Sequence, residues 1–479
     1  MKGTTNKIKM SHKNQTRKQP TINGKILQEN HEGWKIIEIH GDPYERGFAH
    51  GYLLHQELTT VLKKLPFAVN HEIEVSYRKY LATCKRIISP IIKQKSPEIY
   101  QELCGISRGA QMAGQEISVH TLIAWNAFMS MYNYFHYDVT SIQSTKKLKS
   151  QRCSAFIATG KATKNGKIVM AHNSHSDLVS GSLFNIIIYL TPKQGFPFCM
   201  QTAPGYVASG TDWFLSESGM MGCETTIGDT NYQPNFKDGH LPYFCRIRQA
   251  MQYGKNLDEY AKIMTQHNAG DYAGSWLFGD TKTNEIMLCE IGLNIQNIQR
   301  TNDGIFYGMN SAMSFELRDK ETNDQDFFDI TTSSGARNYR LHELLYKTYY
   351  GKLTTENAKK ILSDHYNVLS QTSPVALPPS KLVVKRPVAP CQKNDVPNSN
   401  SVCVHTYNDP ESDYYPHGCQ DGKVVDTEMA KRGEFVGRWG PSCGTPFDAN
   451  KFVQEHPKYK EWERVLVDFP KKDWIRIHS

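Results

Sequence analysis

The stretch Cys153-Ser-Ala-Phe-Ile-Ala-Thr159, with the turn 161–167 and the run Ile168-Val-Met-Ala171 after it, decides the fold. Both runs are short and apolar, and Asn165-Gly166 ends the turn between them. Two such runs around a glycine-containing turn are typical of a β-hairpin. The lysine-rich run Ser141 to Gln151 before them predicts an exposed loop. The hairpin is therefore expected to start at Cys153, directly after a loop.

This position of Cys153 suggests a chemistry that an ordinary cysteine lacks. Most free cysteines behave as small buried hydrophobes, and a structural cysteine is the alternative here. If the peptide bond between Arg152 and Cys153 is cut, the cysteine becomes a chain terminus that the sheet holds rigidly. Its own α-amine, with a pKa of about 7.7–8.0, can then take the thiol proton at neutral pH. Nucleophile and base would belong to one residue.

The sequence on either side of the hairpin indicates an α+β protein. Upstream, Trp34 to His40 alternates as a strand and 44–114 has helical spacing, with a further helical block from Ser118 to Tyr134. Downstream, strands are predicted at Ser182–Leu190, Phe198–Thr202, Gly219–Ile227, Ser275–Gly279, Glu285–Ile291 and Gly304–Gly308, and helices at Leu241–Gln252, Leu257–Gln266, Arg337–Tyr350 and Thr355–His365. Strands with helices on their outer faces fit a four-layer αββα sandwich.

Four regions are expected along the chain. Residues 1–33 form a disordered basic tail, and residues 34–152 an α-rich propeptide or small subunit. Residues 153–390 form the αββα catalytic core, which ends in a proline-rich surface crossing. Residues 391–479, rich in Tyr, Trp and Pro, form a C-terminal segment that wraps the core. The tail has six basic and no acidic residues up to Pro20 and is expected to be solvated, with weak contact with a membrane surface as the alternative.

Composition narrows the function classes. The chain has 479 residues, 39% of them hydrophobic and 22% charged, which is typical of a globular protein with a large core. The net charge of +8 owes much to the tail, and nothing in the body indicates nucleic-acid binding. Eleven scattered cysteines without a CxxC pair argue against a zinc cage and exclude full disulfide pairing within one chain. No signal peptide or membrane-spanning run is recognisable, which favours a cytoplasmic location.

Several ordered motifs resemble known families. Cys153-Ser-Ala-Phe-Ile, followed by Gly166-Lys-Ile-Val-Met-Ala-His172-Asn173-Ser174, is similar to the nucleophile hairpin of the phospholipase B-like proteins and of the acyl-coenzyme A:6-aminopenicillanic acid acyltransferase family. The matching blocks in chain order are Gly41-Asp-Pro-Tyr-Glu-Arg-Gly47-Phe-Ala-His50-Gly51, Ser209-Gly-Thr-Asp212-Trp-Phe, Gly219-Met-Met-Gly-Cys-Glu224-Thr225-Thr226-Ile, Asn268-Ala-Gly-Asp-Tyr272, Tyr307-Gly-Met-Asn310-Ser, Gly335-Ala-Arg337-Asn-Tyr-Arg340-Leu and Arg438-Trp439-Gly440-Pro-Ser-Cys-Gly-Thr445. Both families are N-terminal cysteine hydrolases with the αββα fold.

The resemblance implies roles for particular residues. Cys153 is the nucleophile and its α-amine the base, while His172 and Asn173 orient the amine or polarise the scissile carbonyl, with a structural histidine as the alternative. Asn310 is the expected oxyanion donor. His175 departs from the acidic residue or Trp that relatives carry, so the acidic partner of the amine is open, with Asp212 as a candidate.

Other motif residues have weaker assignments. Glu224, Thr225 and Thr226 end a strand from which hydroxyls or amides can face the nucleophile. Arg337 or Arg340 is able to anchor an anionic head group or carboxylate. The block at Gly41, Gly47, His50 and Gly51 and the residues Trp439 and Trp474 are interpreted as structural packing. No metal or organic cofactor is expected.

The leading hypothesis is an autoproteolytic cysteine acyl hydrolase of the phospholipase B-like type. Its substrate is an acyl lipid or acyl amide, and cleavage leaves fragments 1–152 and 153–479 associated. The alternatives are an acyltransferase or amidase acting on N-acyl amino acids, peptides or β-lactam side chains, and a catalytically silent scaffold that binds lipid or protein.

Overall fold

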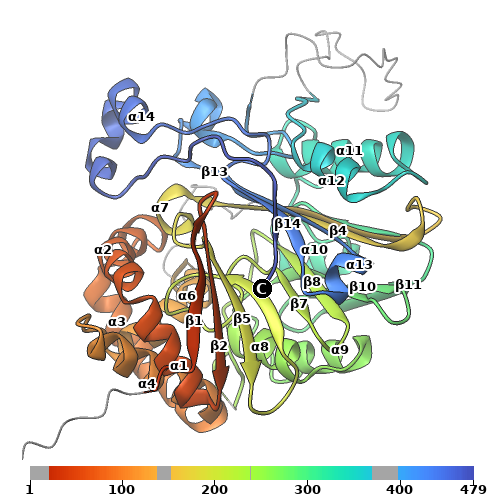
Figure 1. Ribbon diagram of the computed structural model, residues 1–479. Helices are drawn as coiled ribbons and strands as arrows, with labels where there is room; N and C mark the ends of the chain where they lie inside the picture. Colours follow the sequence, from red (N-terminus) through yellow and green to blue (C-terminus); the bar gives the residue numbers. More distant parts are fainter. Residues whose placement is uncertain (1–20, 137–152, 238, 369–396) are drawn as a thin grey trace, which may run out of the picture.

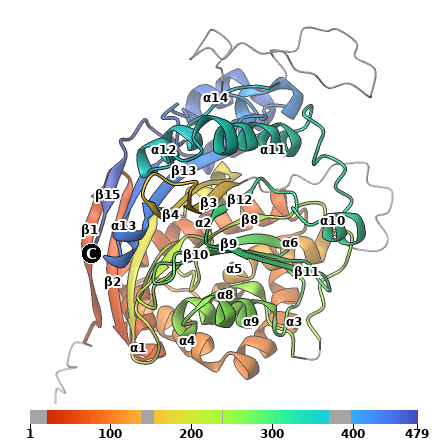
Figure 2. The ribbon, with the colours of Figure 1, turned by 90° about the vertical axis from the view of Figure 1, so that its right-hand side faces the viewer.

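The computed structural model describes residues 21–136, 153–237, 239–368 and 397–479. In these residues the strands form two stacked sheets, and helices cover the outer face of each (Figure 1). Seen from the side, the layers follow one another as helix, sheet, sheet and helix (Figure 2). The predicted four-layer αββα sandwich is thus confirmed.

The larger sheet has nine strands within the described residues. Its order is β1 (Gly24–His31), β2 (Trp34–Gly41), β5 (Ile186–Pro192), β6 (Phe198–Thr202), β7 (Phe214–Ser216), β8 (Met220–Thr226), β9 (Gly274–Asp280), β10 (Glu285–Ile291) and β11 (Gln296–Thr301). β2 runs parallel to β5, and the other neighbouring strands are antiparallel. The region expected to be a propeptide (residues 34–152) therefore contributes one strand, β2, to the main sheet.

Strand β1 corrects the predicted extent of the basic tail. The tail was expected to reach residue 33, but Gly24–His31 pairs with β2 along its length. β1 is an edge strand whose side chains are all at least partly exposed, so it lacks the apolar alternation by which buried strands are recognised. The tail up to Pro20, the lysine-rich loop and the proline-rich crossing lie outside the described residues.

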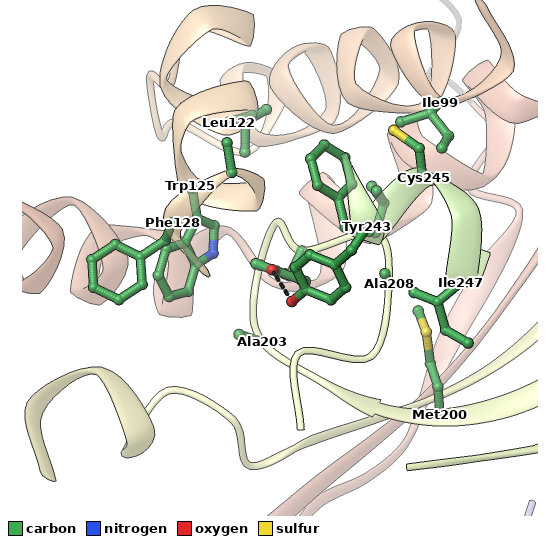
Figure 3. Close-up of a cluster of buried hydrophobic side chains, with 14 of the residues drawn as sticks. Ile99, Leu122, Trp125, Phe128, Met200, Ala203, Ala208, Tyr243, Cys245 and Ile247 are labelled. Atoms are coloured by element: carbon green, nitrogen blue, oxygen red, sulfur yellow. Dashed lines mark hydrogen bonds between the residues drawn. The ribbon is translucent and has the colours of Figure 1, made fainter. Parts of the chain in front are cut away.

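A layer of helices covers the outer face of this sheet (Figure 2). Its helices are α1 (Pro43–Leu53), α2 (His55–Glu72), α3 (Tyr77–Lys95), α4 (Pro97–Met112), α5 (Val119–Asn126), α6 (Phe128–His136), α8 (Tyr243–Tyr253) and α9 (Leu257–Thr265). Figure 3 shows part of the core between helices and sheet, with Trp125, Tyr243 and Met200 converging from three elements. The indole of Trp125 donates to the Pro204 carbonyl (2.9 Å), so its polar atom is satisfied in the core.

The glycine-rich motif near the start of α1 is structural, as predicted. A Cβ at Gly47 would lie 2.1 Å from the Glu102 carbonyl oxygen, and one at Gly51 would lie 2.0 Å from that of Ile106. Only glycine lets α1 approach α4 this closely. His50 is buried and its Nε2 accepts from the Gly205 amide (2.8 Å).

The smaller sheet has six strands in the order β12 (Gly304–Gly308), β3 (Ser154–Gly160), β4 (Gly166–Asp177), β13 (His417–Asp426), β14 (Phe435–Trp439) and β15 (Ile475–Ile477). Three of these strands come from the segment that was expected only to wrap the core. The predicted boundary at residue 390 therefore divides one sheet. β13 is buried on both faces and carries Asp421, Gly422 and Lys423, so its pattern does not resemble a strand.

The helices outside the smaller sheet complete the fourth layer. They are α11 (Ser333–Glu343), which continues as a π-helical turn at Leu344–Thr348, and α12 (Thr355–Leu362), with α14 (Ala449–Glu455) above them in Figure 2. The remaining short helices are α7 (Leu178–Gly181), α10 (Phe315–Glu321), α13 (Thr427–Lys431), and 3₁₀ turns at Thr406–Asn408, Pro410–Ser412 and Pro457–Arg464. Trp439 packs against Trp34, with ring centroids 5.2 Å apart, which confirms its predicted packing role.

Among the described helices, none combines the length and the apolar character needed to cross a lipid bilayer.

Candidate active site

The predicted hairpin places Cys153 at the start of the central strand pair. β3 pairs with β4 so that Ala155 lies opposite His172 and Ser154 lies opposite Asn173. β12 pairs with the other edge of β3, with Gly308 opposite Ala155. Cys153 thus precedes a strand that is held on both sides. Arg152, on the other side of the expected cleavage bond, lies outside the described residues.

The thiol of Cys153 sits in surroundings that keep it protonated. Burial is the largest cause that raises the pKa of this thiol, and the neighbouring Glu224 and Asp212 carboxylates raise it further. A hydrogen bond from the His175 backbone N–H and the charge of Lys423 oppose this shift. The cysteine therefore needs a base before it can attack as a thiolate.

Arg337 joins the backbone of Cys153 to the side chain of Asn310. Its Nη1 donates to the Cys153 carbonyl oxygen (2.6 Å) and to Asn310 Oδ1 (3.1 Å). Its Nε donates to Ser333 in the first turn of α11 (3.2 Å to the carbonyl oxygen). The guanidinium is fully buried, so the expected head-group contact is wrong for this residue. Arg337 instead ties α11 to the backbone of Cys153, directly before β3.

The amide of Asn310, the expected oxyanion donor, is hydrogen-bonded at both of its polar atoms. Its Nδ2 donates to the Thr226 carbonyl (2.8 Å) while its Oδ1 accepts from Arg337, and these bonds fix the orientation of the amide. One N–H of Nδ2 is left for a further acceptor. The backbone has φ +76°, in the left-handed region that side chains seldom adopt. Strain of this kind is characteristic of functional sites.

Asp212 and Glu224 form a buried carboxyl pair beside the thiol. Tyr272 Oη donates to Glu224 Oε2 (3.0 Å) and Asp212 Oδ2 (3.4 Å), and Thr226 Oγ1 contacts the same hydroxyl (2.5 Å). Burial raises the pKa of Asp212 to about 7, against hydrogen bonds with Glu224 and Tyr272. Burial and the charge of Asp212 raise the pKa of Glu224. The pair therefore shares a proton near neutral pH.

Asn173 and His172 lie on opposite faces of β4. The amide of Asn173 donates to the carbonyl oxygens of Leu362 (2.8 Å) and Val402 (3.3 Å), which belong to the outer layer. Asn173 therefore does not orient the amine, and its predicted catalytic role is wrong because strand alternation turns it away from the space between the sheets.

His172 lies opposite Ala155 rather than Cys153. Burial lowers the pKa of its imidazole, and the charge of Lys423 lowers it further, so the ring is neutral at physiological pH. Lys423 pairs with Asp421 (2.6 Å), and both side chains are fully buried. Lys423 also donates to Ser174 and Gln201, so this network joins the two sheets behind the site.

Arg340 is wrong as a predicted substrate anchor. It donates to both carboxylate oxygens of Asp364 (3.0 and 2.6 Å) and to Glu343 (3.1 Å), and it stacks on Tyr366. Thr225 has a buried hydroxyl without a hydrogen-bond partner among the described residues, and it faces the Cα of Gly308. It is thus a second available donor close to β12.

Three neighbours of the candidate site were given no role in the sequence analysis. Tyr272 was quoted only as part of a motif, and Lys423 and Asp421 lie on a strand that was not predicted.

A hollow of about 900 Å³, lined by residues that include Glu38, Tyr189 and Ser479, contains none of the candidate residues and does not serve Cys153. Away from these residues, two cysteines and two histidines form a group that could hold a metal ion, namely His365, Cys403, His405 and Cys443.

The four αββα layers are those of the N-terminal-nucleophile hydrolase fold. The chain belongs to the phospholipase B family, whose model matches residues 32–292.

Relatives support this placement over part of the chain. An uncharacterised protein of Archaeoglobus fulgidus is 25% identical over 262 residues, covering 53% of this chain and 42% of its own length. A Caenorhabditis elegans protein assigned as phospholipase B-like 2 is 24% identical over 338 residues, covering 62% and 55%. The chain thus spans about half the length of these relatives.

Solved structures of conjugated bile acid hydrolase from Clostridium perfringens also match. One mutant form has a TM-score of 0.32 and 9% identity, covering 60% of this chain and 89% of its own. A second variant gives a TM-score of 0.29 with the same identity. The layers and the strand order of this chain itself identify its fold.

Proposed function

We propose that the chain is an autoproteolytic cysteine acyl hydrolase that cleaves acyl ester or amide bonds, of lipids in the first place, through an acyl-Cys153 intermediate. The observation that carries this proposal is the Arg337 guanidinium, which joins the Cys153 carbonyl to the Asn310 amide. A buried arginine in this position aligns a reactive strand end with an amide donor. A purely structural cysteine does not require that arrangement.

Self-cleavage would begin with attack of the Cys153 sulfur on the carbonyl carbon of residue 152. The C–S bond forms, the C–N bond breaks, and the Cys153 nitrogen receives a proton and becomes an α-amine. Water then hydrolyses the thioester and releases the carboxylate of residue 152. Because the pKa of the thiol is raised, a neighbouring acceptor must take its proton. The Asp212–Glu224 pair is close enough to shift the pKa of this thiol.

In turnover the free α-amine would take the thiol proton, and the thiolate would attack the acyl carbonyl. His175 stands where relatives carry an acidic residue or Trp, which left the acidic partner of the amine unassigned. The Asp212–Glu224 pair would be this partner, because a carboxylate beside the amine stabilises an α-ammonium. Asn310 Nδ2 donates to the developing oxyanion, and the ammonium returns its proton to the leaving group. Water then releases the acid and regenerates the thiol.

Intact-mass analysis of the purified chain tests the proposal. Splitting is expected to give fragments 1–152 and 153–479, and Cys153→Ala is expected to leave a single uncleaved chain without acyl hydrolysis. Cys104→Ala, a partly buried cysteine on α4, is the matched control and should split normally. A Cys153→Ala chain that still splits after residue 152 would falsify the proposal.

A panel of fatty-acyl esters and acyl amides, assayed with and without an amine acceptor, separates the remaining possibilities. Faster release of acid from esters supports the lipid hydrolase. Transfer to the amine supports the acyltransferase. A chain that neither splits nor shows thiol-dependent turnover is the scaffold.

A further inference from the structure

Two cysteines and two histidines meet in the outer layer, away from the residues of the proposed active site. One ligand atom from each of His365, Cys403, His405 and Cys443 lies within 4.8 Å of every other. His365 follows α12, Cys403 and His405 precede β13, and Cys443 follows β14. Three segments that are distant in the sequence thus place four ligands, of two types that zinc prefers, around one point.

The spacing of these atoms suits a single ion. His405 Nε2 lies 3.3 Å from Cys403 Sγ and 3.3 Å from Cys443 Sγ. With Zn–S of about 2.3 Å and Zn–N of about 2.0–2.1 Å, tetrahedral geometry places sulfur and nitrogen about 3.5 Å apart. A tetrahedral set of two sulfur and two nitrogen ligands is typical of zinc sites in proteins.

Neighbouring groups already orient these ligands. Tyr407 Oη lies 2.6 Å from His405 Nδ1, and a proton held on Nδ1 by that bond leaves the Nε2 lone pair directed at the sulfurs. Ser442 Oγ donates to Cys403 Sγ (3.2 Å), and the Thr445 amide donates to Cys443 Sγ (3.4 Å). These contacts hold both sulfurs in place, and a bound metal ion would take them as thiolates.

We propose that His365, Cys403, His405 and Cys443 bind one Zn²⁺ ion as a structural site. Four protein ligands fill a tetrahedral ion and leave no position for a substrate, so the site holds structure and takes no part in acyl transfer. This revises the expectation of no metal, which rested on the lack of a CxxC pair. Here the ligand pair closest in sequence is a Cys-x-His.

The site would fasten the segment that lies directly behind the nucleophile strand. Val402, next to Cys403, accepts hydrogen bonds on its carbonyl oxygen from Ser154 Oγ (3.1 Å) and Asn173 Nδ2 (3.3 Å). The Cys403 amide donates to the Asp364 carbonyl, next to His365 (3.1 Å). Loss of the metal is therefore expected to lower the stability of the fold and to loosen the backing of Cys153.

Metal analysis of the purified full-length chain, prepared without a histidine tag, tests this site. Mass spectrometry of the elements is expected to find about one zinc per chain. Cys443→Ser is expected to weaken zinc binding more than tenfold in competition with a chelating dye. Cys104→Ser, another partly exposed cysteine, should bind zinc like the parent chain. A chelator should lower the melting temperature of the parent and control chains.

Cobalt replacement gives a second measurement on the parent chain, which decides the matter even if Cys443→Ser does not fold. Tetrahedral Co²⁺ with two thiolates is expected to show visible d–d bands and near-ultraviolet thiolate charge transfer. Tyr407→Phe should weaken metal binding by about 10–100-fold with the ligands intact. A parent chain with no stoichiometric zinc and no thiolate–cobalt band would overturn the proposal. A Cys403–Cys443 disulfide in non-reducing peptide maps would do the same.

Discussion

At the scale of single residues, the candidate site depends on how Arg337 is used. The resemblance indicated a residue that binds substrate, whereas the side chain contacts Cys153, Asn310 and Ser333 of its own chain. A buried planar guanidinium makes these bonds in fixed directions, which a lysine ammonium cannot reproduce. Under the proposed function, Arg337 is a positioning residue for Cys153.

Arg337→Lys is expected to lower kcat by about 100-fold with little change in KM. The reason is that Arg337 holds the Asn310 amide, which donates to the substrate carbonyl under attack. Steady-state kinetics on the best substrate of the ester and amide panel measures both constants. Arg340→Lys is the matched control, since Arg340 lies on the same helix but pairs with Asp364. Equal losses in the two variants, or a change confined to KM, would contradict the assigned role.

The carboxyl pair predicts a pH dependence of stability. Because folding raises the pKa of Asp212 to about 7 and that of Glu224 above its usual value, the folded chain holds more protons than the unfolded chain between about pH 4 and 7. Their contribution is fully present at acid pH and is lost as the pH rises through the folded pKa values. The free energy of unfolding should therefore fall toward pH 8.

Urea unfolding of the Cys153→Ala chain at pH 5 to 8 measures this effect without an α-amine at residue 153. Adding Asp212→Asn and Glu224→Gln is expected to reduce the loss between pH 5 and pH 8. Glu116→Gln, which alters an exposed carboxyl, serves as the control. An unchanged pH slope in the Asp212 and Glu224 variant would refute the shared proton.

At the scale of elements, the close crossing of α1 and α4 makes a sharp prediction. In Gly51→Ala the added Cβ would lie 2.0 Å from the Ile106 carbonyl oxygen, so the helices must move apart. The expected loss is about 1–3 kcal/mol of unfolding free energy. Gly304→Ala, whose nearest atom is a Thr301 side-chain carbon at 3.3 Å, should cost less. Chemical denaturation compares them, and equal stability of the Gly51 variant and the parent would count against the crossing.

At the scale of the whole molecule, the two expected fragments share one sheet and one core. β2 pairs with β5, and Arg248 on α8 donates twice to the buried Glu102 on α4 (3.0 Å each). Arg248 and Arg46 hold the pKa of Glu102 at about 2 despite its burial, so the charges stay paired. Separating the fragments would expose a sheet edge and unpair these charges.

Residues 1–152 and 153–479 produced as two separate chains in one cell are therefore expected to copurify as a one-to-one complex. Size-exclusion chromatography in native buffer measures the association, and denaturing electrophoresis confirms two chains. Each part produced alone should aggregate or degrade. Recovery of fragment 153–479 as a folded monomer would show that the shared sheet is dispensable.

The sequence alone determined the fold class, the hairpin at Cys153 and most helices and strands of the central region. β10 and β12 were predicted at their observed bounds, since buried strands between turns have a strong local pattern. β1 and β13 were not predicted. β1 is an exposed edge strand and β13 carries buried charges, so neither has the apolar pattern of a strand, and each forms by pairing with its neighbour.

Only the tertiary structure decided which side chains share a site. Strand alternation turns Asn173 outward and His172 inward, and the chain order does not reveal the register that sets this. The carboxyl pair, the Arg337 contacts and the two-cysteine, two-histidine cluster join residues from distant segments. A local sequence pattern indicates which side chains of a segment are buried, whereas these sites depend on which distant segments come into contact in the fold.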